Sequence, residues 1–406
     1  MSGFFTRERF GQPQVWAGLL LLAFLAQALW LTSIELRGTA ALEPREQERI
    51  REGWRQWHGG GIAGSPFVDS DAAGQAEARD GFDIHRSPLP YLLSAAPLTA
   101  WPDKPDADVL LQRGWLLRVP FLLCGVLLGA SLWYVARRLC SNAGGYLALA
   151  LYCFSPGMIQ ASAARGTDTE IIAAWGAFGA IFTAIAVAHT LYAPREVVLW
   201  NWRRILLLGI SLLLAVGSQF SLIVVVPLAL GFLLYLAPVR RRAAVAIWAA
   251  GCAVGLLLLF AAYFFHPHTF WQSMRHAAWL GDSWRGFAMP VVYRQLAREI
   301  GRFSPALLLV LPAALVVYVA WPRTRYFGNT APLLVAVIFL LLAVAAPHVD
   351  GTGFLLSAVP FLFVFVAGVF GDLLETRRRP LVLACVLGLL GAHALWSVLA
   401  LARVQG

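Results

Sequence analysis

Apolar runs divided by short polar breaks occupy most of the sequence and restrict what it can fold into. A helix needs about 20 apolar residues to cross a bilayer, and most of the runs approach that length. We therefore expect an all-α integral membrane protein with about 11 transmembrane helices, near residues 15–34, 114–136, 143–162, 170–192, 205–218, 220–237, 243–265, 304–321, 330–347, 354–372 and 381–402. The break between 205–218 and 220–237, Gly217-Ser-Gln-Phe220, is weak, so this pair is the least certain division.

The composition supports the same class. The chain is 59% hydrophobic and 13% charged, whereas soluble domains carry about a quarter charged residues. The five cysteines show no metal-ligand spacing, which argues against a zinc site or a disulfide framework. We expect a single polytopic membrane domain over residues 1–406.

The net charge of +10 is distributed as a membrane topology signal. With a cytoplasmic N-terminus and alternating helices, the cytoplasmic ends receive 15 basic and four acidic residues, and the other side receives 17 basic and 18 acidic residues. This excess of arginine follows the positive-inside rule. We expect a multi-pass protein of the bacterial inner (plasma) membrane, and the basic balance gives no support to a nucleic-acid partner.

Two long segments fall on the outer side in this topology. The first outer loop is residues 35–112, and the second outer loop is residues 266–303. No internal repeat is visible in the sequence, and nearly all charges lie at helix ends, with Arg118 nearest to an exception. Both features argue against the alternative of a transporter or flippase.

The first outer loop contains a candidate catalytic helix over residues 43–57, with Pro44 at its first position. One stripe of this helix combines carboxylates with apolar residues: Glu43, Glu46, Ile50, Gly53, Trp54 and Trp57. The opposite side carries Glu48, Arg51, Glu52 and Arg55. We expect an amphipathic helix at the membrane interface, whose stripe carboxylates either gain basicity by desolvation or pair with neighbouring arginines.

The segment Asp83-Ile-His-Arg-Ser-Pro-Leu-Pro-Tyr-Leu-Leu93 follows a glycine-rich stretch. Its apolar continuation is too short and too rich in proline to cross the membrane. We expect it to return along the membrane surface with His85 and Arg86 near the headgroups. The two side chains either form the rim of a site at the membrane surface or simply anchor the loop.

The order of several motifs resembles the GT-C glycosyltransferases, in particular the protein-mannosyltransferase and lipid A aminoarabinose-transferase group. The pieces that carry the resemblance are REQERIREGW (45–54), HRSPLPYLL (85–93), LLRVPFLLCGVLLG (116–129), ALYCFSPGMIQASAARGTDTEI (150–171) and HPHTFWQSMRHAAWLGDSWRGFAMP (266–290). The resemblance implies a transferase on the outer membrane face. It would use a sugar linked to a polyprenyl phosphate, invert the anomeric centre and employ an acidic residue of the first outer loop as base.

The sequence departs from the family pattern at three positions. The family's Asp-Glu pair corresponds to Arg45-Glu46, a common lysine corresponds to Gln219, and a late basic motif corresponds to the segment that begins at His348. These departures motivate an alternative, a catalytically silent relative that binds lipid or a partner enzyme.

Sugar transfer needs a base for the acceptor and cations for the leaving phosphate. The candidate bases are Glu46, Glu43 and Asp168, although Asp168 also suits the N-cap of the following helix. The candidate substrate-binding residues are His85, Arg86, Arg165, Arg275, His276, Arg285 and His348. Arg165 has the alternative of pairing with Asp168 or Glu170.

Cofactors and partners follow from the same chemistry. No cofactor is certain; the spacing of His266, His268 and His276 leaves a divalent cation open. The expected partners are a polyprenyl-phosphate-linked sugar donor, a lipid, glycan or protein acceptor, and membrane lipids.

Overall fold

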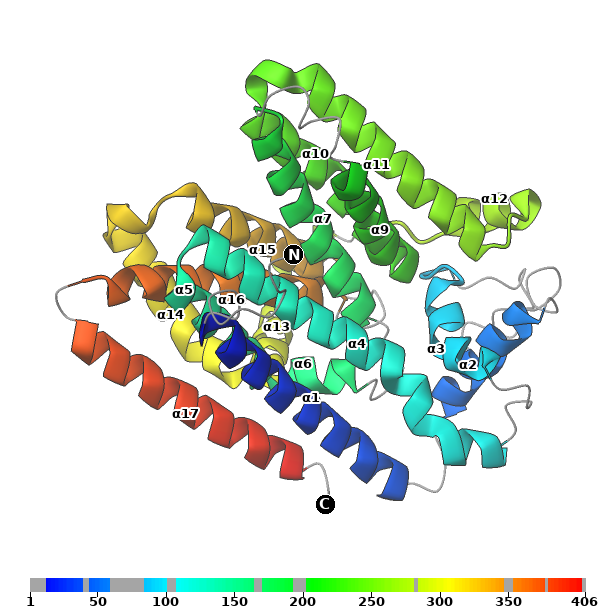
Figure 1. Cartoon of the computed structure of the whole chain (residues 1–406), viewed down its shortest axis with the longest axis horizontal. Helices are drawn as coiled ribbons and strands as arrows, with labels where there is room; N and C mark the ends of the chain where they lie inside the picture. Colours follow the sequence, from blue (N-terminus) through cyan, green and yellow to red (C-terminus); the bar gives the residue numbers. More distant parts are fainter. Residues whose placement is uncertain are drawn as a thin grey trace, which may run out of the picture.

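A computed structural model shows an all-helical architecture in the part of the chain that it describes, residues 12–38, 44–58, 84–100, 107–163, 170–192, 202–280, 284–346, 353–376 and 379–403 (Figure 1). The first half contains α1 (Gln12–Gly38), α2 (Pro44–Trp57), α3 (Leu89–Thr99), α4 (Ala107–Leu139), α5 (Asn142–Cys153), α6 (Pro156–Ser162), α7 (Glu170–Thr190) and α9 (Trp202–Ser218). The second half contains η1 (Phe220–Val224), α10 (Val225–Leu236), η2 (Pro238–Arg240), α11 (Arg241–Ala262), α12 (Pro267–His276), η3 (Trp284–Ala288), α13 (Pro290–Phe303), α14 (Pro305–Ala320), η4 (Pro322–Thr324), α15 (Phe327–Ala345), α16 (Gly353–Leu374) and α17 (Arg379–Arg403).

The membrane class expected from the sequence is confirmed, but the count of about 11 spans is not. Within the described residues, seven helices are long and apolar enough to cross a membrane, or up to eight if α13 and α14, bent by 111°, form one span. The remaining predicted spans are helical but short. The run 143–162 breaks before Pro156 into α5 and α6, because proline cannot continue the hydrogen-bond ladder. The weak break before Phe220 is a true helix end.

The centre of the bundle is formed by α7 and α16, and the periphery by α1, α11 and α17. Most of α7 and α16 is buried, whereas less than a third of each peripheral span is buried. The peripheral helices expose large apolar side chains, such as Leu22, Leu257 and Leu387. Apolar side chains on the outside of a bundle are what a protein surrounded by lipid presents.

Small residues allow the central helices to approach closely. A Cβ added at Gly176 of α7 would lie 2.3 Å from the backbone nitrogen of Ala215 in α9. Close backbone approach through glycine and alanine is the usual means by which helices associate in a membrane, where burial from water gives no driving force.

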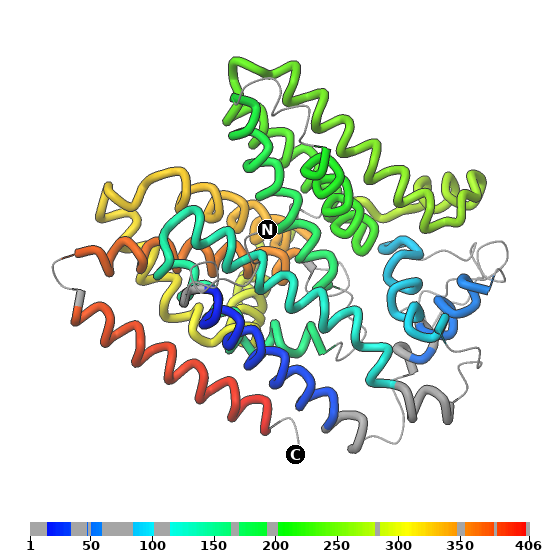
Figure 2. Tube along the Cα trace, in the orientation of Figure 1, coloured from blue at the N-terminus to red at the C-terminus, as the bar shows by residue number. Residues whose placement is uncertain are grey.

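One end of the bundle collects the long connections, and we call it the loop end. It is the end at which α1 and α11 finish and α4 begins, to the right in Figures 1 and 2. Helices α2, α3 and α12 all lie there (Figure 1). The chain trace in Figure 2 shows α2 and α3 side by side, and α3 packs against both α2 and α4.

Helix α2 begins at Pro44 as predicted, and it packs on α3. Ile50 is 1% exposed and shares a small apolar cluster with Leu98 of α3 and Leu117 of α4. The backbones touch at Gly53, where an added Cβ would lie 2.0 Å from the carbonyl oxygen of Tyr91. The face that the sequence assigned to the membrane interface is therefore used for helix packing.

The prediction that the side of α2 opposite the apolar stripe faces solvent is wrong at Glu52. Glu52 is 7% exposed, not solvated, and lies 2.9 Å from the Arg55 guanidinium. Its carboxylate also accepts a hydrogen bond from the Gln56 amide at 3.3 Å. The packing of α2 against other protein widens its buried face beyond the narrow stripe that a free amphipathic helix would bury.

We predict that Gly53→Ala destabilises the loop end, because the new methyl group has no space beside Tyr91. Overpacking of this kind costs about 1–3 kcal/mol. The matched control is Gly388→Ala in α17, where an added Cβ meets nothing within 4 Å. A glycine-to-alanine change in an open helix position is neutral or stabilising by about 0.5–1 kcal/mol. Thermal unfolding of the two variants in the same detergent measures the difference, and equal midpoints would contradict the prediction.

Candidate active site at the loop end

The backbone of residues 84–88 is irregular, and hydrogen bonds fasten this segment to the break between α9 and η1. The backbone nitrogen of Ser87 donates to the Gly217 carbonyl oxygen at 3.0 Å, and the Ser87 hydroxyl donates to the same oxygen at 2.6 Å. In return, the Phe220 nitrogen donates to the His85 carbonyl oxygen at 2.9 Å. These bonds satisfy backbone groups that a helix break would otherwise leave unpaired.

The second predicted loop reaches the same place. The Ala278 nitrogen, just after α12, donates to the Ile84 carbonyl oxygen at 2.7 Å. The Trp279 ring packs on the Phe220 ring with centroids 5.3 Å apart. Three segments far apart in the sequence, 84–88, 217–220 and 278–279, therefore meet at the loop end.

Buried polar side chains line this junction. Gln219 is 6% exposed, and its amide nitrogen donates to the Ser221 hydroxyl at 2.7 Å. The Gln219 amide oxygen and the Ser218 hydroxyl are buried and have no hydrogen-bond partner among the described residues. A buried polar atom without a partner costs about 1–3 kcal/mol, so such atoms mark a place where a polar ligand would be favourable.

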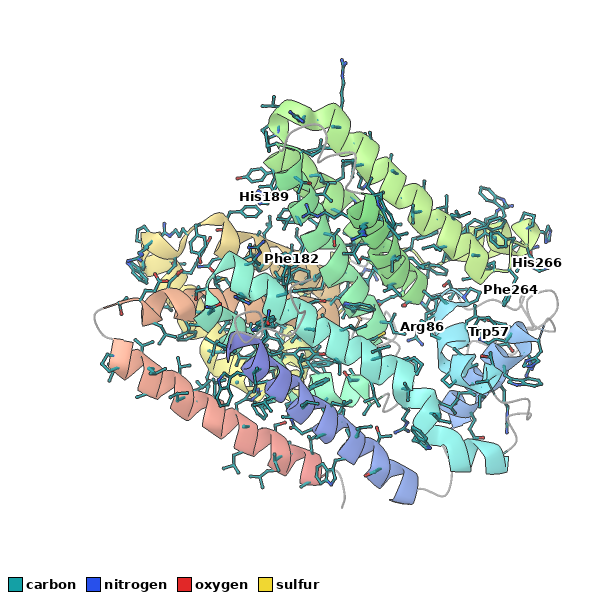
Figure 3. All side chains as sticks on the ribbon, viewed as in Figure 1. Trp57, Arg86, Phe182, His189, Phe264 and His266 are labelled. Atoms are coloured by element: carbon teal, nitrogen blue, oxygen red, sulfur yellow. The ribbon has the colours of Figure 1, made fainter. Side chains whose placement is uncertain are left out.

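Four of the predicted phosphate-binding residues lie near this junction. His85 and Arg86 are half-buried within the fastened segment, and Arg86 is labelled in Figure 3. Arg275 and His276 are exposed on the last turn of α12, directly before the bond from Ala278. The structure thus brings the backbone of these four residues to one neighbourhood.

Arg285 has other neighbours. It is exposed in η3, which packs against α13 and α15. Position 46 lies in the first turn of α2, one helical turn before the buried Ile50. The remaining predicted residues, Glu43, Arg165, Asp168 and His348, lie outside the described residues.

Buried charges at the loop end were missed by the sequence analysis as site residues. Glu170, the first residue of α7, is 4% exposed, and Arg118 near the start of the α4 span is also 4% exposed. Glu52 of α2 is buried as well. Glu170 stands where the positive end of the helix dipole favours a carboxylate. Its position at the first turn of a predicted helix was the only sequence signal for it.

An aromatic contact joins α2 to the turn between α11 and α12. The Trp57 and Phe264 rings meet edge to face with centroids 6.0 Å apart, and the Trp57 indole nitrogen donates to the Leu92 carbonyl oxygen at 2.9 Å (Figure 3). Phe264 and Phe265 have φ values of 50° and 59°. This left-handed conformation is unfavourable for a bulky residue, by about 1–2 kcal/mol. The turn therefore holds two phenylalanines in a conformation that glycine would adopt without strain.

The described residues contain no group of three or more His, Cys, Asp or Glu side chains placed to hold a metal ion. His266, His268 and His276 are all among them, so the structure does not gather these histidines into a ligand set. The His266 imidazole instead lies 3.1 Å from the Tyr263 carbonyl oxygen, and the His276 imidazole lies 2.9 Å from that of Gln272.

Comparison with known proteins identifies the class of this fold. The sequence model of the dolichyl-phosphate-mannose-protein mannosyltransferase family matches residues 94–271. The oligosaccharyltransferase of Archaeoglobus fulgidus in its apo form is similar over 99% of this chain and 56% of that protein, with a TM-score of 0.62 and 12% identity. A search of curated protein sequences finds no match.

The complex of the same archaeal enzyme, AglB, with an inhibitory peptide and a dolichol-phosphate gives a TM-score of 0.60 at 12% identity, over 97% of this chain and 56% of that protein. This chain thus spans little more than half the length of those structures. The protein is a membrane protein with the GT-C fold. Its resemblance to the GT-C glycosyltransferases of the protein-mannosyltransferase type, stated from the sequence, is confirmed by the family match and the fold together.

We predict that the variant Ile84→Cys/Ala278→Cys forms a disulfide under mild oxidation, because the hydrogen bond between these residues places their backbones side by side. The control pair is Ile84→Cys/Val239→Cys, since Val239 is 85% exposed in η2, at the start of α11 and therefore at the other end of that helix. Mobility on a non-reducing gel and peptide mass spectrometry detect the cross-link. Cross-linking of the control pair alone, or of neither pair, would contradict the described junction.

Proposed function

We propose that the protein is a glycosyltransferase that moves a sugar from a polyprenyl-phosphate donor to an acceptor at the outer face of the membrane. The observation that carries the proposal is the meeting of the segment 84–88, the buried Gln219 and the end of α12 at the loop end of a GT-C fold. In the topology favoured by the arginine distribution, with a cytoplasmic N-terminus, this end faces outward.

The reaction requires that the acceptor attack the anomeric carbon while the bond from that carbon to the phosphate oxygen breaks. The acceptor's proton passes to a base, and the polyprenyl phosphate leaves with the bonding electrons and its negative charge. Attack from the side opposite the leaving phosphate inverts the anomeric centre. The protein must therefore present a carboxylate on one side of the sugar and cationic donors on the other.

Glu46 is the proposed base. Position 46 precedes Ile50, which packs against Leu98 of α3, by one helical turn, and this spacing supports the proposal. The segment 84–88 leads directly into α3, so position 46 and Arg86 belong to adjoining elements. Glu43 and Asp168 remain the alternative bases.

Arg86 is the proposed phosphate contact, with His85, Arg275 and His276 beside it. A guanidinium is always charged and binds phosphate oxygens in pairs. Because hydrogen bonds already hold the backbone of residues 84–88, less conformational entropy is lost when the Arg86 side chain binds the donor. Arg165, Arg285 and His348 are further candidates for the same donor.

The archaeal structure described with a peptide and a dolichol-phosphate supports the kinds of donor and acceptor proposed here. A lipid-linked donor matches the phosphate chemistry of Arg86. The acceptor of this chain is proposed only as a class: a lipid, a glycan or a protein. A bacterial inner membrane is the proposed location, and the sequence leaves a divalent cation open.

The second candidate function is a catalytically silent relative that binds the lipid phosphate without transferring sugar. The observation that favours it is Arg45, which stands where the family pattern has an aspartate. Membranes containing the protein, incubated with a panel of radiolabelled polyprenyl-phosphate sugars, separate the two candidates. Donor binding without transfer from any sugar would support the silent relative and refute the enzyme.

For an active protein we predict that Glu46→Gln lowers the transfer rate about 100- to 10,000-fold with donor affinity little changed, because loss of a general base acts on chemistry. Glu48→Gln on the same helix is the matched control and should retain nearly full activity. Equal activity of both variants would exclude Glu46, and Glu43→Gln and Asp168→Asn would then be measured in the same assay.

We also predict that Arg86→Ala weakens donor binding by about 1.5–3 kcal/mol, the value of a hydrogen bond to a charged group. Arg51→Ala, at an exposed position of α2, is the control and should bind the donor as the unchanged protein does. Titration with a polyprenyl-phosphate sugar, followed by protein fluorescence, measures both affinities. Unchanged affinity in Arg86→Ala would show that residues 85–86 only anchor the loop at the membrane.

A further inference from the structure

Helix α13 carries a row of three exposed arginines that the proposed reaction does not use. Arg294, Arg298 and Arg302 are spaced four residues apart, so they follow one side of the helix, and all three are exposed. Like charges at this spacing repel one another and weaken a helix. An anion bound outside the helix would offset this repulsion.

The opposite side of α13 is fixed to the protein. Leu296, Ile300 and Phe303 pack against the main apolar core, and the Phe303 carbonyl oxygen accepts a hydrogen bond from the Ser155 hydroxyl. The helix also packs against α6, α14, α15 and α16. The arginine row consequently points away from the bundle, and its orientation is set by packing.

The bend after α13 is the geometry expected of a helix that lies at the depth of lipid headgroups. Helices α13 and α14 meet at 111°, so α13 runs nearly perpendicular to the apolar helix that follows it. Leu308 and Leu309, near the start of α14, are 48% and 72% exposed. We infer that lipid chains contact α14 up to the bend. A helix that leaves the hydrocarbon at this point lies in the interface, where phosphate groups are found.

We propose that the Arg294–Arg298–Arg302 row binds anionic phospholipid headgroups of the surrounding bilayer. The occupant is chosen by charge and by depth: three cations on one fixed face, followed along the chain by the exposed leucines of α14, match a negatively charged lipid surface. The exposed Met289 and Val291 at the start of the helix add apolar contacts for the acyl boundary.

An acidic neighbour of the row gives the proposal an internal control. The Arg302 guanidinium lies 2.8 Å from the Glu299 carboxylate, with the arginine side chain 76% exposed. Glu299 thus neutralises part of the row. Glu299→Gln should strengthen lipid binding, whereas Arg294→Gln/Arg298→Gln/Arg302→Gln should weaken it, and neither changes the buried face of α13.

The experiment reports binding at α13 itself. A polarity-sensitive dye is attached at Gln295→Cys, an exposed position beside the row, in a background with the exposed Cys385 replaced by serine. The protein is titrated in detergent micelles with short-chain phosphatidylglycerol, with short-chain phosphatidylcholine and with inorganic phosphate. We expect saturable binding of phosphatidylglycerol alone.

The expected loss in the triple glutamine variant is roughly 100-fold, because each of the three arginines near an anionic surface contributes about a factor of five and the factors multiply. Glu299→Gln should bind severalfold more tightly. Arg240→Gln/Arg241→Gln/Arg242→Gln, which removes the same charge from exposed positions of η2 and α11, should leave the dye response unchanged.

Several outcomes would overturn the proposal. Equal binding of phosphatidylcholine would show that the row does not select anionic lipid. Saturation by inorganic phosphate at the same concentration would make the row a site for free phosphate. Saturation by polyprenyl phosphate at a far lower concentration than phosphatidylglycerol would assign the row to the donor site instead of the bilayer.

Discussion

The architecture of the loop end depends on the hydrogen bonds of backbone that is not helical. At the border of a membrane, a helix break exposes polar groups that lipid cannot satisfy, so each break must find a partner within the protein. The break at 217–220 finds it in residues 85–87, and residue 278 completes the pairing through Ile84. The same bonds that satisfy the breaks therefore determine which loops meet, and the candidate site is a consequence of that pairing.

Glycine then decides how tightly these elements fit. Gly176 lets α7 lie against α9, which positions the break at the end of α9. Gly53 lets α2 lie on α3, so that the acidic helix approaches the segment that carries His85 and Arg86. Neither contact involves a large apolar side chain at the point of closest approach. Helix association here depends on the absence of side chains at two positions as much as on the presence of apolar ones elsewhere.

The sequence predicted the helical membrane class, the family resemblance, the start of α2 at Pro44 and the break before Phe220, because periodicity, proline and length are local signals. It did not predict the burial of Glu52, since a carboxylate's surroundings depend on which element packs over it. Its count of about 11 spans is not confirmed, in part because Ser155-Pro156 divides an apolar run whose composition is uniform. The convergence of residues 84, 217 and 278 is a property of tertiary packing that no local pattern contains.

The turn at Phe264 and Phe265 shows where the protein keeps an unfavourable conformation. A chain under no constraint except stability would place glycine or asparagine there. Two phenylalanines stand there instead, one against Trp57 and the other against Phe260. The turn could therefore be stabilised by residues that tolerate a positive φ. It is the first position to alter when a more robust form of this protein is wanted for crystallisation or cryo-microscopy.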